Sequence, residues 1–124
     1  MKSFKMKNEL IQRTKQFALG CWHFCFKVPK SREYNAFVNQ LIRSSSSVGA
    51  NYRASQRAKS TADFINKLKI VEEECDESVY WLEIFEEIFP EQIQEISILK
   101  KEGKELLAII VASINTAKRN QKRN

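Results

Sequence analysis

The chain has 124 residues, of which 43% are hydrophobic and 29% charged, a balance typical of a folded domain and not of a disordered chain. Only three glycines and two prolines are present, which leaves few turns and argues against a sheet-rich fold. No apolar stretch approaches about eighteen residues, so no membrane span is predicted, and residues 1–7 lack the apolar core of a signal peptide. Three cysteines, an odd number, favour a reducing, cytoplasmic location.

The net charge of +6 is unevenly distributed. Residues 1–60 contain 12 Lys and Arg against 2 Asp and Glu, a net charge of +10, whereas residues 61–124 contain 9 against 13, a net charge of −4. The two halves should therefore attract each other, and the excess of basic residues favours a polyanionic partner.

The first predicted helix covers residues 8–27, with Asn8 as its N-cap. Its apolar stripe has spacings of four and three: Leu10, Thr14, Phe17, Cys21, Phe24 and Val28. The second covers 32–58, with the stripe Phe37, Leu41, Ser44, Val48, Tyr52 and Ser55. The stripe continues in register on both sides of four serines, 44–47. We therefore interpret these serines as small residues at a tight helix contact and not as a linker.

The third predicted helix covers 61–89, begins with a capping box at Ser60 and Asp63, and ends before Pro90. Its stripe is Phe64, Leu68, Val71, Cys75, Ser78, Leu82, Phe85 and Phe89. The fourth covers 92–118, with the stripe Ile96, Leu99, Gly103, Leu106, Ile110, Ile114 and Ala117. A basic, frayed C-terminal tail is predicted at 119–124.

Four long helices joined by short connections at 28–33, 58–61 and 89–92 predict an all-α fold, an antiparallel up-down-up-down four-helix bundle. No internal repeat or second core is evident, so residues 1–124 are expected to form a single domain.

The chemistry-bearing side chains do not assemble a predicted active site. Cys21 and Cys25 share a helix face, but the only histidine, His23, points elsewhere, so buried free thiols are expected. The acidic run at 72–77 lacks the Glu-x-x-His pairs of a di-iron bundle, and we expect it to pair with basic residues of the second helix. We therefore predict no catalytic residues, no metal and no cofactor.

Three arginines of the second helix, Arg43, Arg53 and Arg57, fall on a stripe roughly opposite its apolar face. Such a stripe is either a solvated face, a set of ion pairs with another subunit, or a contact surface for nucleic-acid phosphates. Further candidates for phosphate contact are Lys59 and the tail residues Lys118, Arg119, Lys122 and Arg123. Because most aromatic residues sit on or beside the core stripes, stacking platforms for bases are not expected, and binding should depend little on sequence.

The last two helices have more apolar residues than one buried face needs, which suggests a contact between subunits. These residues are Ile65, Val79, Trp81, Ile84, Ile88, Ile98, Leu107, Ile109 and Val111.

Three segments carry a family resemblance: 40–54 (QLIRSSSSVGANYRA), 60–68 (STADFINKL) and 72–82 (EEECDESVYWL). With them, residues 8–118 resemble the four-helix-bundle proteins encoded in intervening sequences of bacterial 23S ribosomal RNA genes (S23 ribosomal protein-like), a family that includes the accessory variability protein of diversity-generating retroelements.

The resemblance implies a homo-oligomeric ring, typically a pentamer, with a basic surface that binds RNA or DNA, no enzymatic activity, and a reverse transcriptase as partner in the retroelement branch. It also points to a polar network, within or between subunits, or to RNA contact, at Asn51, Arg53, Arg57, Asp63, Lys67, Glu73 and Glu77. The alternative function is a homo-oligomeric protein–protein interaction scaffold that binds no nucleic acid.

Overall fold

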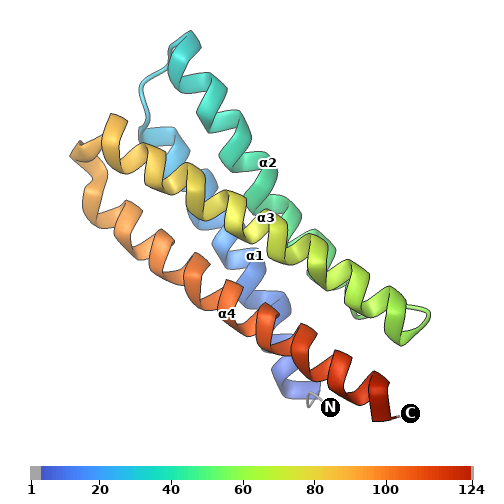
Figure 1. The fold of residues 1–124 in the computed structure, drawn as a ribbon. Coiled ribbons are helices and arrows are strands. Elements are labelled where there is room, and N and C mark those ends of the chain that lie inside the picture. Colours follow the sequence, from blue (N-terminus) through green and yellow to red (C-terminus); the bar gives the residue numbers. More distant parts are fainter. Residues whose placement is uncertain (1–3, 124) are drawn as a thin grey trace.

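The computed structural model describes residues 4–123, which form four long helices (Figure 1). These are α1 (Phe4–Lys27), α2 (Arg32–Ser55), α3 (Thr61–Ile88) and α4 (Ile93–Arg123), with a short 3-10 turn, η1 (Pro90–Gln92), before α4. No strand occurs among the described residues, so the predicted all-α class and the four helices are confirmed.

The predicted helix ends are less accurate than the helices themselves. α1 begins at Phe4, so Asn8 lies inside the helix and the prediction of an N-cap there is wrong. α2 ends at Ser55 and not at residue 58, because the next three amides bond to carbonyls three residues back, as in a 3-10 turn. Residues 56–58 contain neither glycine nor proline, so the sequence marks no end there.

The start of α3 follows its prediction closely. The Ser60 hydroxyl accepts a hydrogen bond of 3.1 Å from the Asp63 amide, as an N-cap does. The Asp63 carboxylate accepts from the Lys59 amide at 3.0 Å, one residue earlier than in the usual reciprocal box. The Asp63 amide is one of those that the first helical turn leaves without a partner, and the Lys59 amide belongs to the residue before the N-cap.

The predicted frayed tail is wrong over the described residues, since α4 continues to Arg123. Lysine, arginine and glutamine have good helix propensity, and their positive charges are favourable near a helix C-terminus. Asn124, the last tail residue, and residues 1–3 lie outside the described part of the chain.

Each helix packs against two others. α1 and α3 both contact α2 and α4, while α1 and α3 lie diagonally across the bundle without contact between their backbones. In the α2–α3 pair, Tyr34 bonds to the Ile88 carbonyl and Ser44 to Ser78, so the residue numbers run in opposite directions along the two helices. Figure 1 shows the four helices aligned along one long axis.

The predicted stripes form one continuous core. All six stripe residues of α1 and its flank, from Leu10 to Val28, are buried. In α2 to α4 the stripe residues are also buried, except for Phe37, Phe64 and Ala117, which are partly buried against the core. The Phe24 ring, in the last turn of α1, is fully buried and edge-on to Phe85, with ring centroids 5.3 Å apart. The period of the apolar pattern therefore located the core correctly.

The serine run is helical, and its first two members, Ser44 and Ser45, are buried. The Ser78 hydroxyl of α3 lies 3.0 Å from the Ser44 hydroxyl, which lets the two helices approach closely. Ser46 is exposed and bonds only to the Arg43 carbonyl in its own helix. Small residues at a tight contact, and not a linker, are what the structure shows.

A buried serine and an exposed serine of the same run, Ser44 and Ser46, allow the energetic effect of this contact to be tested. We expect Ser44→Leu to destabilise the protein by about 1–3 kcal/mol, because the larger side chain must be accommodated between two closely packed helices. Ser46→Leu should stay within about 0.5 kcal/mol of the parent, as for other surface positions. Urea unfolding followed by circular dichroism measures both; equal losses would contradict a tight α2–α3 contact.

Candidate nucleic-acid interface

The predicted arginine stripe lies on the outer surface of α2, and the structure divides it into two parts. Arg43, Arg53 and Arg57 are all exposed. The Arg43 guanidinium pairs with Glu74 of α3 at 2.9 Å and with Glu77. Within the described residues, Arg53 and Arg57 form no ion pair, so their charges are available to a ligand.

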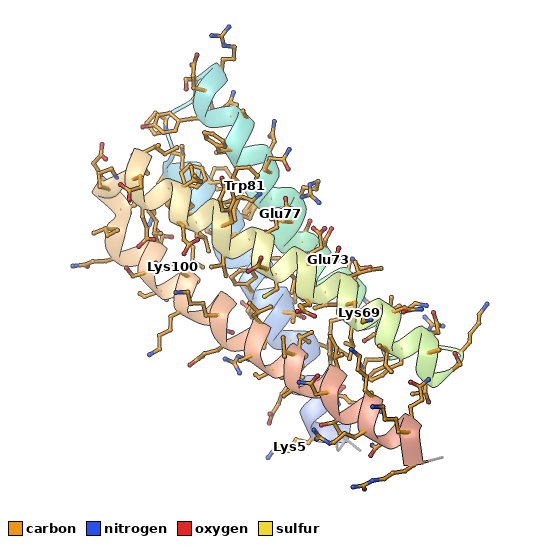
Figure 2. The ribbon with its side chains drawn as sticks, in the orientation of Figure 1. Lys5, Lys69, Glu73, Glu77, Trp81 and Lys100 are labelled. Atoms are coloured by element: carbon orange, nitrogen blue, oxygen red, sulfur yellow. The ribbon has the colours of Figure 1, made fainter. Side chains whose placement is uncertain are left out.

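The Arg43 pair is part of a small polar cluster on the α2–α3 surface. Glu77 accepts a hydrogen bond of 3.0 Å from the Trp81 indole, and this bond, together with Arg43, lowers the pKa of the Glu77 carboxyl. The hydrogen bond to Glu77 in turn raises the pKa of Arg43. Figure 2 shows Glu73, Glu77 and Trp81 in sequence along α3. The prediction that the acidic run pairs with a basic residue of the second helix is confirmed at Arg43.

The other predicted polar positions make separate local contacts. Lys67 donates to Asp63 at 2.6 Å, which with the Lys59 amide lowers the pKa of Asp63. The Asn51 amide donates to the Ser47 carbonyl at 2.9 Å, one turn earlier. Glu73 is exposed. Among the described residues no hydrogen bond joins these groups into one network, so any such network would need a second subunit.

Basic residues gather at one end of the molecule. Figure 1 places the α2–α3 connection and the C-terminal end of α4 at the same end of the bundle. Arg57 and Lys59 belong to that connection and are exposed. Four predicted basic residues on the last turns of α4 are also exposed: Lys118, Arg119, Lys122 and Arg123. Because this segment is helical, its charges lie on the last turns of α4, at the same end of the bundle as the α2–α3 connection.

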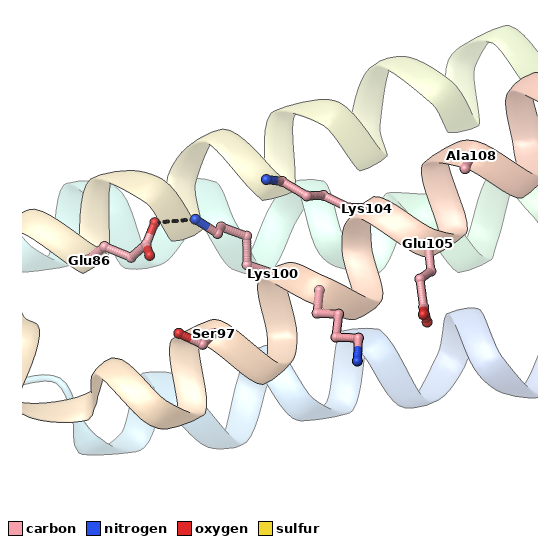
Figure 3. A pocket seen from close by; sticks show the side chains of 7 residues that line it. Glu86, Ser97, Lys100, Lys104, Glu105 and Ala108 are labelled. Atoms are coloured by element: carbon pink, nitrogen blue, oxygen red, sulfur yellow. Dashed lines mark hydrogen bonds and ion pairs between the residues drawn. The ribbon is translucent and has the colours of Figure 1, made fainter.

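A shallow depression of about 440 Å³ on the α3–α4 surface contains lysines that sequence reasoning did not single out (Figure 3). Lys100, Lys101 and Lys104 line it, and Lys100 pairs with Glu86 at 2.7 Å. Glu105 lies on the same wall. Glu86 neutralises Lys100, whereas Glu105 pairs with Arg13 of α1 at 2.8 Å, so Lys101 and Lys104 are the lysines of the depression without an ion pair in the described chain.

All three cysteines are free thiols, as predicted, and Cys21 and Cys75 are buried while Cys25 is partly buried. Burial raises the pKa of Cys21 and of Cys75 to about 12, and that of Cys25 to about 11. The Cys75 thiol donates to the Gly103 carbonyl at 3.2 Å. In residues 4–123, no three His, Cys, Asp or Glu side chains group as a metal site requires.

These thiols should react slowly in the folded protein, because the thiolate is the nucleophile and burial disfavours it. At pH 8 we expect Cys25 to react first with a disulfide reagent, and Cys21 and Cys75 only on unfolding. Counting labelled cysteines by mass spectrometry, with and without denaturant, tests this. Rapid labelling of Cys75 in the native protein would show that its environment is not closed.

Sequence reasoning missed a set of exposed aromatic residues. The exposed fractions are 46% for Trp22, 69% for Phe26 and 51% for Tyr80, so these three are exceptions to the expectation that most aromatic residues sit on or beside the core stripes. The rings of Trp22 and Phe26 meet edge-on with centroids 4.4 Å apart. Both lie outside the α1 stripe, which is the signal that could have revealed them.

The excess apolar residues of α3 and α4 divide between core and surface. Ile65 and Val79 are buried and widen the core. Ile88 and Ile98 are exposed, at 38% and 70%. The remaining five are partly buried: Trp81, Ile84, Leu107, Ile109 and Val111.

Fold and surface together define an all-helical protein of four long helices with a basic end. A sequence profile of the 23S rRNA-intervening sequence protein family matches residues 6–112, and the chain belongs to this family. No curated protein matches it. Over the described residues, no helix has an apolar stretch that could cross a bilayer.

Among solved structures, the chain is similar to a protein of unknown function from the S23 ribosomal protein family of Bacteroides thetaiotaomicron VPI-5482. The two are 27% identical, and the match covers 88% of this chain and 97% of the other, with a TM-score of 0.80. The resemblance seen in the sequence is thereby confirmed at the level of the family.

Proposed function

We propose that the protein is a non-catalytic, cytoplasmic nucleic-acid-binding protein that assembles from up-down-up-down bundles into a ring, five-membered by the family resemblance. The observation that carries the binding function is the pair Arg53 and Arg57, exposed and without an ion pair in the described chain. An unpaired guanidinium can bind phosphate oxygens with two parallel hydrogen bonds and loses no existing partner in doing so.

The surroundings of these arginines support an anionic ligand. Between residues 10 and 58 the sequence contains one acidic residue, Glu33, which pairs with Arg32 at 2.9 Å. Lys59 and the basic end of α4 lie at the same end of the bundle as Arg57. Binding would use backbone phosphates, and its affinity would come largely from the release of counterions. A reverse transcriptase is a further proposed partner, on the resemblance alone.

The test is the charge reversal Arg53→Glu with Arg57→Glu. We expect weaker binding to an RNA hairpin and to a DNA duplex, and a salt slope that flattens by about 0.9 for each duplex phosphate that the variant no longer binds. Filter binding across a series of salt concentrations measures both quantities. Arg43→Glu should have a smaller effect on binding, because Glu74 and Glu77 already neutralise Arg43.

A matched control keeps the change in charge and moves it elsewhere. Arg32→Glu with Lys101→Glu alters two exposed basic residues away from the basic end and should retain most of the affinity. If both double variants lose affinity equally, binding follows net charge and not this site. If the parent binds neither nucleic acid at low salt, the proposal fails.

A scaffold that binds no nucleic acid is the second candidate, and the Arg43 cluster favours it. There, an arginine of the predicted stripe already pairs with the acidic face of α3. In an assembly, Arg53 and Arg57 could pair in the same way with the exposed Glu73 of a neighbour. Loss of the oligomer, and not of RNA binding, in Arg53→Glu with Arg57→Glu would support the scaffold.

A further inference from the structure

The outer face of α1 presents a cluster of apolar side chains that the bundle does not cover. Leu19, Trp22 and Phe26 are spaced three and four residues apart, so they share one helix face. Their exposed fractions are 39%, 46% and 69%. The contact of the Trp22 and Phe26 rings makes this α1 face a continuous aromatic surface. An exposed patch of this kind is typical of a protein interface.

α3 carries a second such face. Tyr80, Ile84 and Ile88 are four residues apart; Tyr80 and Ile88 are 51% and 38% exposed, and Ile84 is partly buried. The Tyr80 ring packs edge-on against the Trp81 ring, with centroids 5.0 Å apart. This α3 face therefore also presents an ordered apolar surface.

The two faces point to opposite sides of the bundle at the same height along its axis. α1 and α3 are diagonal, so the sides that do not face the core point away from each other. The rings of Phe24 and Phe85 meet across the core, which puts these two residues at one height. Phe24 lies between Trp22 and Phe26, and Phe85 lies between Tyr80 and Ile88.

The charges around the two faces are complementary. Residues 10–32 contain five Lys and Arg and no acidic residue, and three of the five pair within the chain: Arg13, Lys27 and Arg32. Residues 70–88 contain eight Asp and Glu and no basic residue, and three of the eight pair within the chain: Glu74, Glu77 and Glu86. Lys15 and Lys30 are exposed near the α1 face. Near the α3 face, Glu83 and Glu87 are exposed. Two copies would therefore attract through unlike faces and repel through like faces.

We propose that the α1 face of one copy packs on the α3 face of the next copy. This contact would join neighbouring subunits of the ring, and it rests on the oligomer in the proposed function. Such a contact joins two different surfaces, so every copy keeps one free face for a further neighbour. Contacts of this kind close into a ring only without a rise from one subunit to the next, and otherwise form a filament. The equal height of the two faces removes the rise. Closure also requires that each subunit is rotated relative to the last, and because the faces lie on opposite sides of the bundle, this rotation must come from the angle at which they pack.

The test uses one variant for each face. Trp22→Glu with Phe26→Glu puts negative charge on the α1 face, and Tyr80→Lys with Ile88→Lys puts positive charge on the α3 face. We expect each variant alone to be monomeric by light scattering at micromolar concentration. Mixed in equal amounts, they should form a one-to-one heterodimer, because each retains the face that the other lacks. Ala108→Glu with Ala112→Glu, exposed on α4, should keep the parent mass.

Several results would overturn this contact. Dissociation of one variant only, with no heterodimer on mixing, indicates a contact between like faces. If both variants keep the molar mass of the parent oligomer, neither face is the subunit contact. RNA binding by the same samples would then leave the proposed nucleic-acid function intact. If the α1 variant keeps the molar mass of the parent but loses affinity for single-stranded RNA, the α1 face is a platform on which bases stack. A monomeric parent would refute the ring itself.

The folded state of each variant is checked by its helical circular dichroism and thermal transition. If a charged pair unfolds the protein, the milder changes Phe26→Ser and Tyr80→Ser replace it, since both side chains are more than half exposed. Each should weaken the oligomer, shifting its dissociation to higher protein concentration. An unchanged dissociation curve in both serine variants contradicts the proposed contact.

Discussion

Replacing Phe24 by alanine is expected to destabilise the protein by about 3–5 kcal/mol, the largest effect of any single change we predict. Phe24 is fully buried, and its ring packs against Phe85 of α3 and against Phe89, the residue that follows α3, with centroids 5.3 Å and 6.4 Å away. Because α1 and α3 are diagonal, the ring fills the space between two helices whose backbones do not touch. Its removal leaves a cavity that neither helix can easily close.

The measurement is urea unfolding of Phe24→Ala at the same protein concentration as the parent. The loss is a large fraction of the roughly 5–15 kcal/mol that stabilises a typical domain, so partial unfolding at 37 °C is expected. Gln16→Ala, at an exposed position of the same helix, should stay within about 0.5 kcal/mol of the parent. A loss below about 1 kcal/mol for Phe24→Ala would mean that the core around Phe24 repacks freely.

The position of Phe24 illustrates what the sequence could predict about the fold. A stripe with spacings of four and three is a property of each helix alone, so it placed Phe24, Leu82 and Ile110 in the core before the helices were arranged. Helix ends depend on which residues supply the last hydrogen bonds. Asn8 can cap a helix, but the residues before it are also able to be helical, and α1 continues through them to Phe4.

For the candidate interface, the sequence could predict only which side of the second helix the arginines occupy. Helical geometry placed Arg43, Arg53 and Arg57 away from the core, and all three are exposed. Which of them keeps a free charge depends on α3, because Glu74 and Glu77 come within reach of Arg43 only in the folded bundle. Packing between helices, which no single-helix pattern contains, made this distinction.

The α1 face was missed for a related reason. Trp22 and Phe26 are strongly apolar, and burial is the usual fate of such residues. Their angles on the helix place them outside the stripe, but from the sequence we grouped them with the aromatic residues on or beside the core stripes. The structure shows that the core is already filled from α1 by Phe17, Cys21 and Phe24. The angle of a residue on the helix therefore predicted its burial better than its hydrophobicity did.

If the proposed ring binds nucleic acid, its disassembly should reduce the affinity by more than the loss of any single arginine. A ring presents several copies of a weak phosphate-binding surface to one polyanion, and linked sites of this kind gain about 10²–10⁴-fold over a single site. The monomeric variant Trp22→Glu with Phe26→Glu retains Arg53 and Arg57, so its affinity for an RNA hairpin should fall by that factor. Its salt slope should also flatten, since fewer phosphates are contacted by each bound particle.

Two comparisons separate this effect from the added negative charge. Ala108→Glu with Ala112→Glu changes the net charge equally and should keep both the ring and its affinity. The neutral pair Trp22→Ser with Phe26→Ser removes the α1 face without adding charge and should lose affinity in proportion to the ring it loses. Filter binding at one salt concentration, with light scattering on the same samples, relates affinity to assembly. A monomer that binds the hairpin as tightly as the ring would show that one subunit contains the whole binding surface.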